Sequence, residues 1–143
     1  MKKGIIIFSL LFVVIYLLAQ TKPKTASQGG TDKASVDRGK KIYDIYCLAC
    51  HQADGSGVPR LNPPLIKTKW VLGDKKELIT VILKGMDEPI EVDGEDYNNV
   101  MASHAFLKDQ EVADVLTYVR KSFGNKASGV ISSEVKTVRA TMK

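Results

Sequence analysis

The sequence predicts a mainly helical fold with long loops. Apolar residues recur at helical spacing in the segments 78–82 and 112–119. No segment alternates convincingly between apolar and polar residues over the length of a strand. Glycines and prolines gather between Ala53 and Leu65, which indicates a loop, and Met86 to Ala105 is expected to form a second long loop. The expected fold class is therefore all-α.

Four helices are expected, and residues that favour helix ends flank them. The expected helical ranges are 36–47, 75–84, 110–123 and 134–141. The expected N-caps are Ser35, Asp74 (with Glu77 completing a capping-box-like pair), Asp109, and either Ser132 or Ser133. Gly85 and Gly124 are expected to end the second and third helices.

Composition divides the chain into four parts, one of them of ordinary domain size. Residues 1–20 resemble an export signal, because Lys2 and Lys3 precede an apolar run that ends at Ala19. This run is short for a membrane span of about 20 residues, but Leu17 fits a cleavage site poorly, so a signal peptide and a retained anchor both stay open. Residues 21–33 have the polar, glycine-containing composition of a flexible linker. A folded domain is expected over 34–126, followed by a C-terminal tail with a short helix over 127–143.

The charge distribution argues against a nucleic-acid-binding protein. The net charge of +5 includes Lys2 and Lys3 of the N-terminal segment, and no dense basic run follows them. Six of the 16 acidic residues, and no basic one, lie between Asp87 and Asp96. We interpret this segment as a solvated loop, with a docking patch for a basic partner or a weak calcium site as alternatives.

Both cysteines and one of the two histidines fall in a single motif, Cys47-Leu48-Ala49-Cys50-His51. This spacing is the attachment motif of c-type haem. Two thiols three residues apart each add to one vinyl group of the haem, and His51 then comes under the iron as an axial ligand. The motif predicts one covalent haem c, which would also give the long loops a surface on which to rest.

Other uses of a Cys-x-x-Cys pair fit this sequence less well. A thioredoxin-like pair follows a strand and opens a helix, whereas this pair ends an expected helix. A zinc site needs four ligands, and beyond the motif only His104 remains as a histidine or cysteine candidate. A disulfide between Cys47 and Cys50 would close a very small loop and stabilise the fold little.

The order of these motifs resembles the class I cytochrome c family, in particular its bacterial monohaem type. The resemblance covers roughly 32–125 of the chain. Besides the haem motif, it rests on the segments Gly39–Tyr43, Gly55–Pro59, Asn62–Leu65, Tyr97–Met101 and Leu107–Arg120. It implies a class I cytochrome c fold, in which short helices and long loops wrap around one covalently bound haem.

The sixth ligand of the iron has three candidates in the folded part, Met86, Met101 and His104. The resemblance implies Met101, because the family places its axial methionine in the loop before the last major helix. A methionine–histidine pair gives a higher reduction potential than two histidines. One departure from the family is Ala102, since a proline usually follows the methionine.

The resemblance also implies two supporting contacts. The carbonyl of Pro63 is expected to accept a hydrogen bond from the imidazole of the haem motif, which would fix the orientation of the ring. Gly39 and Tyr43 are expected to pack against the last major helix at Val115 and Tyr118, because the terminal helices cross in this family.

The resemblance implies an electron carrier and not an enzyme, with a single haem that cycles between Fe3+ and Fe2+. The expected partners are redox proteins, such as membrane respiratory complexes or a dehydrogenase. The expected location is the periplasm, on the outer side of the bacterial cytoplasmic membrane, with membrane contact only through an uncleaved N-terminal segment. The alternatives are a haem c subunit of a larger dehydrogenase or reductase, and an open-site haem enzyme or sensor. We interpret Trp70 as a packing residue rather than a redox relay.

Overall fold

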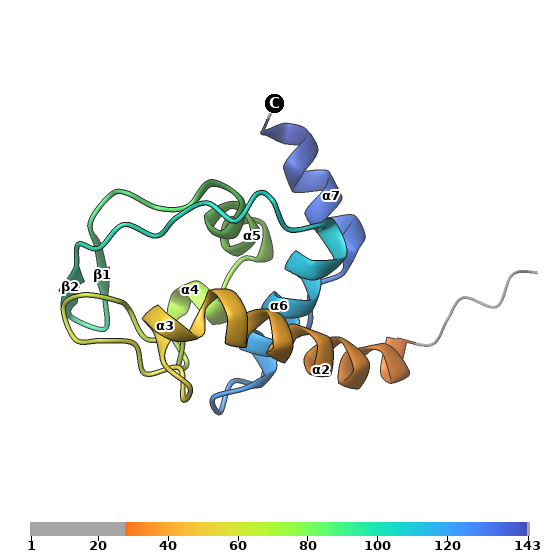
Figure 1. The fold of residues 1–143 in the computed structure, drawn as a ribbon, viewed down its shortest axis with the longest axis horizontal. Coiled ribbons are helices and arrows are strands. Elements are labelled where there is room, and N and C mark those ends of the chain that lie inside the picture. The colour runs from red at the N-terminus through yellow and green to blue at the C-terminus, as the bar shows by residue number, and fades with distance from the viewer. Residues whose placement is uncertain (1–27, 143) are drawn as a thin grey trace, which may run out of the picture.

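The computed structural model describes residues 28–142, which form helices joined by long loops (Figure 1). The expected export segment 1–20 and the first part of the expected linker lie outside these residues. The elements are α2 (Gln28–Tyr46), α3 (Leu48–His51), α4 (Lys69–Leu72), α5 (Lys75–Lys84), β1 (Ile90–Val92), β2 (Glu95–Tyr97), α6 (Asp109–Lys121) and α7 (Ser132–Thr141). Within the described range, no helix has the length and apolar character needed to cross a membrane.

Helices α2 and α6 pack against each other at a close crossing (Figure 1). The approach depends on Gly39, because a Cβ atom there would overlap the backbone carbonyl of Asp114 and lie 2.8 Å from Cβ of Tyr118. Tyr43, one turn further along α2, is fully buried, and its ring centroid lies 5.2 Å from that of Tyr118. The expected contact of Gly39 and Tyr43 with the last major helix is therefore present, although Asp114 and not Val115 lies at the closest approach.

A buried carboxylate ties the same two helices together. Asp114 of α6 accepts hydrogen bonds from Ser35 Oγ at 2.5 Å and from Gln110 Nε2 at 2.9 Å. It also accepts two from Arg38, with Nε at 2.6 Å and Nη2 at 2.7 Å. Burial by itself would raise the pKa of this carboxyl, but the hydrogen bonds, with Arg38 foremost, outweigh burial and hold the pKa below its usual range.

The start of α2 differs from the expectation. The helix begins at Gln28, so residues 28–33 are helical and do not belong to a flexible linker. A tertiary contact stabilises the early turns, since Asp32 Oδ2 lies 3.0 Å from Lys121 Nζ of α6. Ser35 is consequently inside the helix, where its hydroxyl donates to the buried carboxylate of α6 instead of capping a helix end.

The later helix ends lie close to their expected positions. Asp74 accepts hydrogen bonds from two backbone N–H groups at the start of α5, and Gly85, with a φ of 77°, ends that helix. Asp109 is the first residue of α6 and not its cap. The N-cap is Lys108, whose backbone N–H donates to Glu111 at 2.7 Å.

The long loop after α5 contains a short antiparallel β-hairpin, a detail of the mainly helical fold that was not expected from the sequence. Ile90 of β1 pairs with Tyr97 of β2. The connecting residues Asp93 and Gly94 have φ values of 52° and 86°, the left-handed conformation that two-residue hairpin turns favour. Each strand has only three residues, which is too short for an alternating pattern to be recognised.

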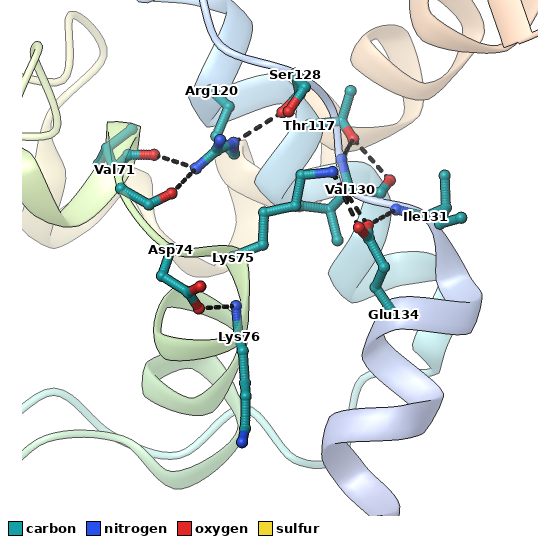
Figure 2. Close-up of polar contacts among 11 residues, drawn as sticks. Val71, Asp74, Lys75, Lys76, Thr117, Arg120, Ser128, Val130, Ile131 and Glu134 are labelled. Atoms are coloured by element: carbon teal, nitrogen blue, oxygen red, sulfur yellow. Dashed lines mark hydrogen bonds and ion pairs between the residues drawn. The ribbon is translucent and has the colours of Figure 1, made fainter.

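The C-terminal helix α7 packs against α5 and α6 (Figure 1). Its apolar face buries Val135 and Val138. Figure 2 shows that Glu134 accepts hydrogen bonds from Lys75 Nζ at 3.0 Å and from the backbone N–H of Ile131 at 2.8 Å. The helix of the expected tail is therefore packed onto the rest of the described fold.

A buried arginine holds the connection between α6 and α7. Arg120 donates from Nη1 to the carbonyls of Val71 at 2.6 Å and Gly73 at 3.2 Å, and from Nε to the carbonyl of Ser128 at 2.8 Å (Figure 2). The first two carbonyls lie at the end of α4, a one-turn helix that was not expected from the sequence. Arg120 thus fixes the position of α4 and of Trp70 within it.

Candidate functional site

A cavity of about 290 Å³ is the central feature of the candidate site. It lies between α3, α5, α6 and the loops around them, and its wall is mostly apolar. The five residues that the sequence analysis marked as haem-binding all line it, although they come from three separate segments. These residues are Cys47, Cys50, His51, Pro63 and Met101.

The haem motif lies on the one-turn helix α3, directly after α2. The backbone N–H groups of Cys50 and His51 both donate to the carbonyl of Cys47, at 3.2 and 2.9 Å. Residues three and four positions apart share one face of a helix, so the two thiols and the imidazole lie on the same face. Gln52 then has a φ of 62° and ends the turn. A single helical turn therefore presents all three side chains together.

The ring of His51 is held by the loop that follows the motif. Its Nδ1 lies 3.0 Å from the carbonyl oxygen of Pro63, so Nδ1–H donates and Nε2 is free to bind a metal. Burial lowers the pKa of His51, the hydrogen bond to Pro63 opposes this shift, and His104 lowers the pKa further. The imidazole is thus neutral and oriented, as a metal ligand must be.

The position of the Pro63 carbonyl depends on a glycine. Gly57 has a φ of 65°, and a Cβ atom there would overlap the carbonyl of Asn62 and come within 2.7 Å of the Pro63 backbone. The backbone N–H of Gly57 donates to the carbonyl of His51 at 3.1 Å. The loop therefore lies tightly against the end of α3, and only glycine fits at this point.

The two cysteines of the motif differ in burial, since Cys47 is partly buried and Cys50 is exposed. Burial, followed by the proximity of Cys50, raises the pKa of Cys47 to about 11. The Cys47 thiol is therefore protonated at neutral pH and a poor nucleophile. This argues against a thiol–disulfide redox role for the pair.

The candidate sixth ligands come from two chain segments that meet at the cavity. Met86 and Met101 form an antiparallel bridge with hydrogen bonds of 2.9 and 2.8 Å between their backbones. Residues paired in this way have their side chains on the same face of the ladder. Both methionines and His104 line the cavity. Of the two methionines, Met101 is the one whose side chain packs against the main hydrophobic core.

Two of the residues that line the cavity carry a buried polar atom that bears on whether a haem fits. Trp70 Nε1 and His104 Nδ1 are buried and have no hydrogen-bond partner among the described residues. Leaving such a group unpaired costs about 1–3 kcal/mol. A haem combines a flat apolar ring with polar carboxylates, so it suits a mostly apolar wall that carries two unpaired polar atoms. The residues present therefore fit the group that the motif predicts.

One rim of the cavity carries an aromatic cluster that sequence reasoning did not identify. The rings of Tyr46 and Phe106 have centroids 5.3 Å apart, and His104 lies 6.4 and 5.8 Å from them. Tyr46 is 44% exposed and Phe106 is 64% exposed.

The hairpin residues Ile90 and Tyr97 also line the cavity. The Asp-Gly turn was the one available signal for this hairpin.

Comparison with known proteins points in the same direction. The family described as Cytochrome c matches residues 36–123. Cytochrome c-552 of Thermus thermophilus is 41% identical over 121 residues, which cover 78% of this chain and 80% of that protein. The cytochrome c subunit of the quinone alcohol dehydrogenase of Gluconobacter oxydans is 33% identical over 117 residues, or 80% of this chain and 24% of that subunit. The cytochrome c subunit of gluconate 2-dehydrogenase of Pantoea cypripedii is 34% identical over 102 residues, or 67% of this chain and 22% of that subunit.

Proposed function

Because the chain belongs to the cytochrome c family, which carries electrons on covalently bound haem c, we propose that Cys47 and Cys50 form the two thioether bonds and that His51 is an axial ligand. The observation that carries this assignment is the single turn α3, which brings both thiols and a neutral, oriented imidazole to one apolar cavity. The protein is an electron carrier and not an enzyme.

The bound haem supplies a one-electron couple, Fe3+/Fe2+. The residues of the chain bind, orient and shield it. The carbonyl of Pro63 fixes the ring of His51 and increases its basicity, which tunes the potential. Apolar side chains of α5 and α6, such as Ile82 and Leu116, exclude water from the site. Burial of this kind also contributes to setting the potential.

Met101 is the proposed second axial ligand. Its packing against the hydrophobic core supports this choice over Met86, and a thioether suits haem iron. With His51 and Met101 both bound to the iron, no position would be left for a substrate.

We expect Met101→Ala to abolish the near-infrared methionine-to-iron band and to admit carbon monoxide, whereas Met86→Ala keeps the band. Loss of the band in the Met86 variant would refute the assignment. Carbon monoxide binding by the unaltered protein, without the band, would favour an open-site haem enzyme or sensor.

Covalent attachment is tested separately from ligation. After acid–acetone extraction and denaturing electrophoresis, the mature protein should stain for haem peroxidase activity. The Cys47→Ser, Cys50→Ser double variant should give a colourless band. Haem that is extracted from the unaltered protein would refute the thioether assignment.

The protein exchanges electrons with other redox proteins, and its relatives include cytochrome c subunits of dehydrogenases. Our proposal is that it does so in the periplasm, with a dehydrogenase or respiratory complex as partner. We assign the haem domain to residues 34–126, with 1–20 as signal or anchor and 127–143 as a C-terminal extension. Cell fractionation tests the location, and the intact mass of the haem protein tests whether residues 1–20 are retained. Haem protein in the cytoplasm would refute the location, and a full-length mass in the membrane fraction would indicate a retained anchor.

A second candidate is that this chain is a permanent haem c subunit of a larger enzyme. The exposed aromatic rim formed by Tyr46 and Phe106 favours it, because large apolar side chains at a surface are typical of interfaces. Purification from native membranes under mild conditions separates the two candidates. A carrier elutes alone at the mass of a monomer, whereas a subunit co-elutes with a fixed partner at constant stoichiometry.

A further inference from the structure

The loop that carries Met101 is fixed to α5 on one side. Met101 itself exchanges two backbone hydrogen bonds with Met86, just after α5 ends. Ser103 Oγ and the backbone N–H of His104 donate to carbonyls in the last turn of α5, at 2.6 and 2.9 Å. These contacts hold the first part of the loop and leave residues 105–108 to be held by other elements.

One side chain of α7 binds the backbone of the second part of the loop, where Leu107 is also buried in the hydrophobic core. Arg139 donates from Nη1 to the carbonyl of Ala105 at 2.9 Å and from Nη2 to the carbonyl of Leu107 at 2.7 Å. Its Nε donates to Asp109 Oδ1, in the first turn of α6, at 2.7 Å. Two of the three donors therefore bind the segment between Met101 and α6, and the third binds the first residue of α6. The Arg139 side chain is 32% exposed. Its bonds to Leu107 and Asp109 are partly buried, whereas the bond to Ala105 lies at the surface.

Helix α7 is a firm support for this arginine. Val135, one turn before Arg139, is fully buried, and Val138 is also buried. The ion pair of Glu134 with Lys75 attaches the start of the helix to α5 (Figure 2). Figure 1 shows α7 beside the point where the loop after β2 enters α6. The family match ends at residue 123, so this support lies outside the matched region.

We propose that Arg139 is a positioning residue for the iron ligand Met101. By binding the carbonyls of Ala105 and Leu107, it keeps the loop closed and so prevents Met101 from leaving the iron. The inference rests on the proposed ligand role of Met101. Arginine is required because its planar fork makes several hydrogen bonds at once, whereas lysine is a point charge and would keep about one of them.

The test measures how often Met101 leaves the iron in the ferric holoprotein. Imidazole at saturating concentration captures the iron when the iron–sulfur bond opens, and loss of the near-infrared band reports the rate. Loss of one hydrogen bond to a charged group changes such an opening equilibrium by about tenfold. We expect Arg139→Ala, which loses both carbonyl contacts, to exchange up to about a hundredfold faster than the unaltered protein. Arg139→Lys, which keeps about one of them, should exchange about tenfold faster. The matched control is Lys75→Met, which removes only the α7–α5 ion pair and should stay within about twofold.

The outcomes separate this inference from the ligand assignment. If the unaltered protein has no band, or Met101→Ala keeps it, the ligand assignment fails. If the band is present and Arg139→Ala exchanges no faster than Lys75→Met, the role of Arg139 is refuted. If Arg139→Ala does not fold, the exchange rate of Arg139→Lys is compared with that of Lys75→Met instead. An equal rate refutes the proposal, and a faster rate for Arg139→Lys supports it.

Discussion

Replacing Asp114 by asparagine should remove the main polar tie between α2 and α6. The carboxylate is buried and accepts four hydrogen bonds at 2.5–2.9 Å. Asparagine has one acceptor oxygen, and its amide would face the donors of Arg38. Each lost bond to a charged group is worth about 1.5–3 kcal/mol, but relief from burying a charge offsets part of that loss. Arg38 is 51% exposed and can be rehydrated. We therefore expect a loss of about 2–3 kcal/mol in the free energy of unfolding.

The pH dependence of this loss distinguishes a charge effect from a packing effect. The pKa of Asp114 is lowered in the folded state, whereas an unfolded aspartate titrates near about 3.9. The stabilisation is therefore fully present above about pH 4 and is lost as the pH falls through the lower folded pKa. Asparagine does not titrate, so the stability gap between the two proteins should narrow below about pH 4.

Guanidinium unfolding of the holoproteins, followed by circular dichroism from neutral pH to about pH 3, measures the gap. Asp44→Asn is the matched control, because it removes an exposed pair with Lys40 on the same helix and should leave the unfolding midpoint unchanged. A gap that stays constant over the whole pH range would show that the carboxylate charge contributes nothing.

Three further substitutions test the packing around the site. Gly39→Ala should lower the free energy of unfolding by about 3 kcal/mol, since the new methyl group overlaps the Asp114 carbonyl; an unchanged denaturation midpoint would contradict the close helix crossing. Gly57→Ala should move the Pro63 carbonyl away from the axial imidazole and raise the reduction potential by up to about 60 mV, a tenfold shift for one electron; redox titration showing a lower potential would contradict this. Tyr43→Phe removes a partly buried 2.6 Å hydrogen bond to the carbonyl of Gln52, just after the haem motif, and should cost about 1 kcal/mol of unfolding free energy; a more stable variant would show that the hydroxyl is not needed.

The features that could be predicted from the sequence are those that local chemistry determines. Asp74 and Gly85 delimit α5 because a carboxylate at an N-cap and a glycine at positive φ act within one turn. The haem motif was recognised for a similar reason, since one helical turn brings its three side chains together. The Asp93-Gly94 turn was also a local signal, but strands of three residues gave no alternation to support it.

The features that could not be predicted depend on partners far away in the chain. Ser35 has the chemistry of an N-cap, yet its hydroxyl is used by a carboxylate 79 positions later. Arg120 and Arg139 look like ordinary charged residues of amphipathic helices. They are nevertheless the side chains that hold α4 and the Met101 loop. Periodicity shows which face of a helix is apolar, but it does not show which charged residue at the margin of that face will reach a backbone carbonyl.

The size of the cavity predicts that folding depends on the haem. A void of about 290 Å³ with a mostly apolar wall leaves many core side chains without packing partners. A small domain has a total stability of only about 5–15 kcal/mol, so it tolerates such a loss of packing poorly. The unpaired Trp70 Nε1 and His104 Nδ1 add to this cost. We therefore expect the Cys47→Ser, Cys50→Ser variant, purified without haem, to show little helical circular dichroism and no cooperative melting, in contrast to the holoprotein in the same buffer. A haem-free variant that melts cooperatively with native helix content would refute this, because it would show that the helices alone stabilise the fold.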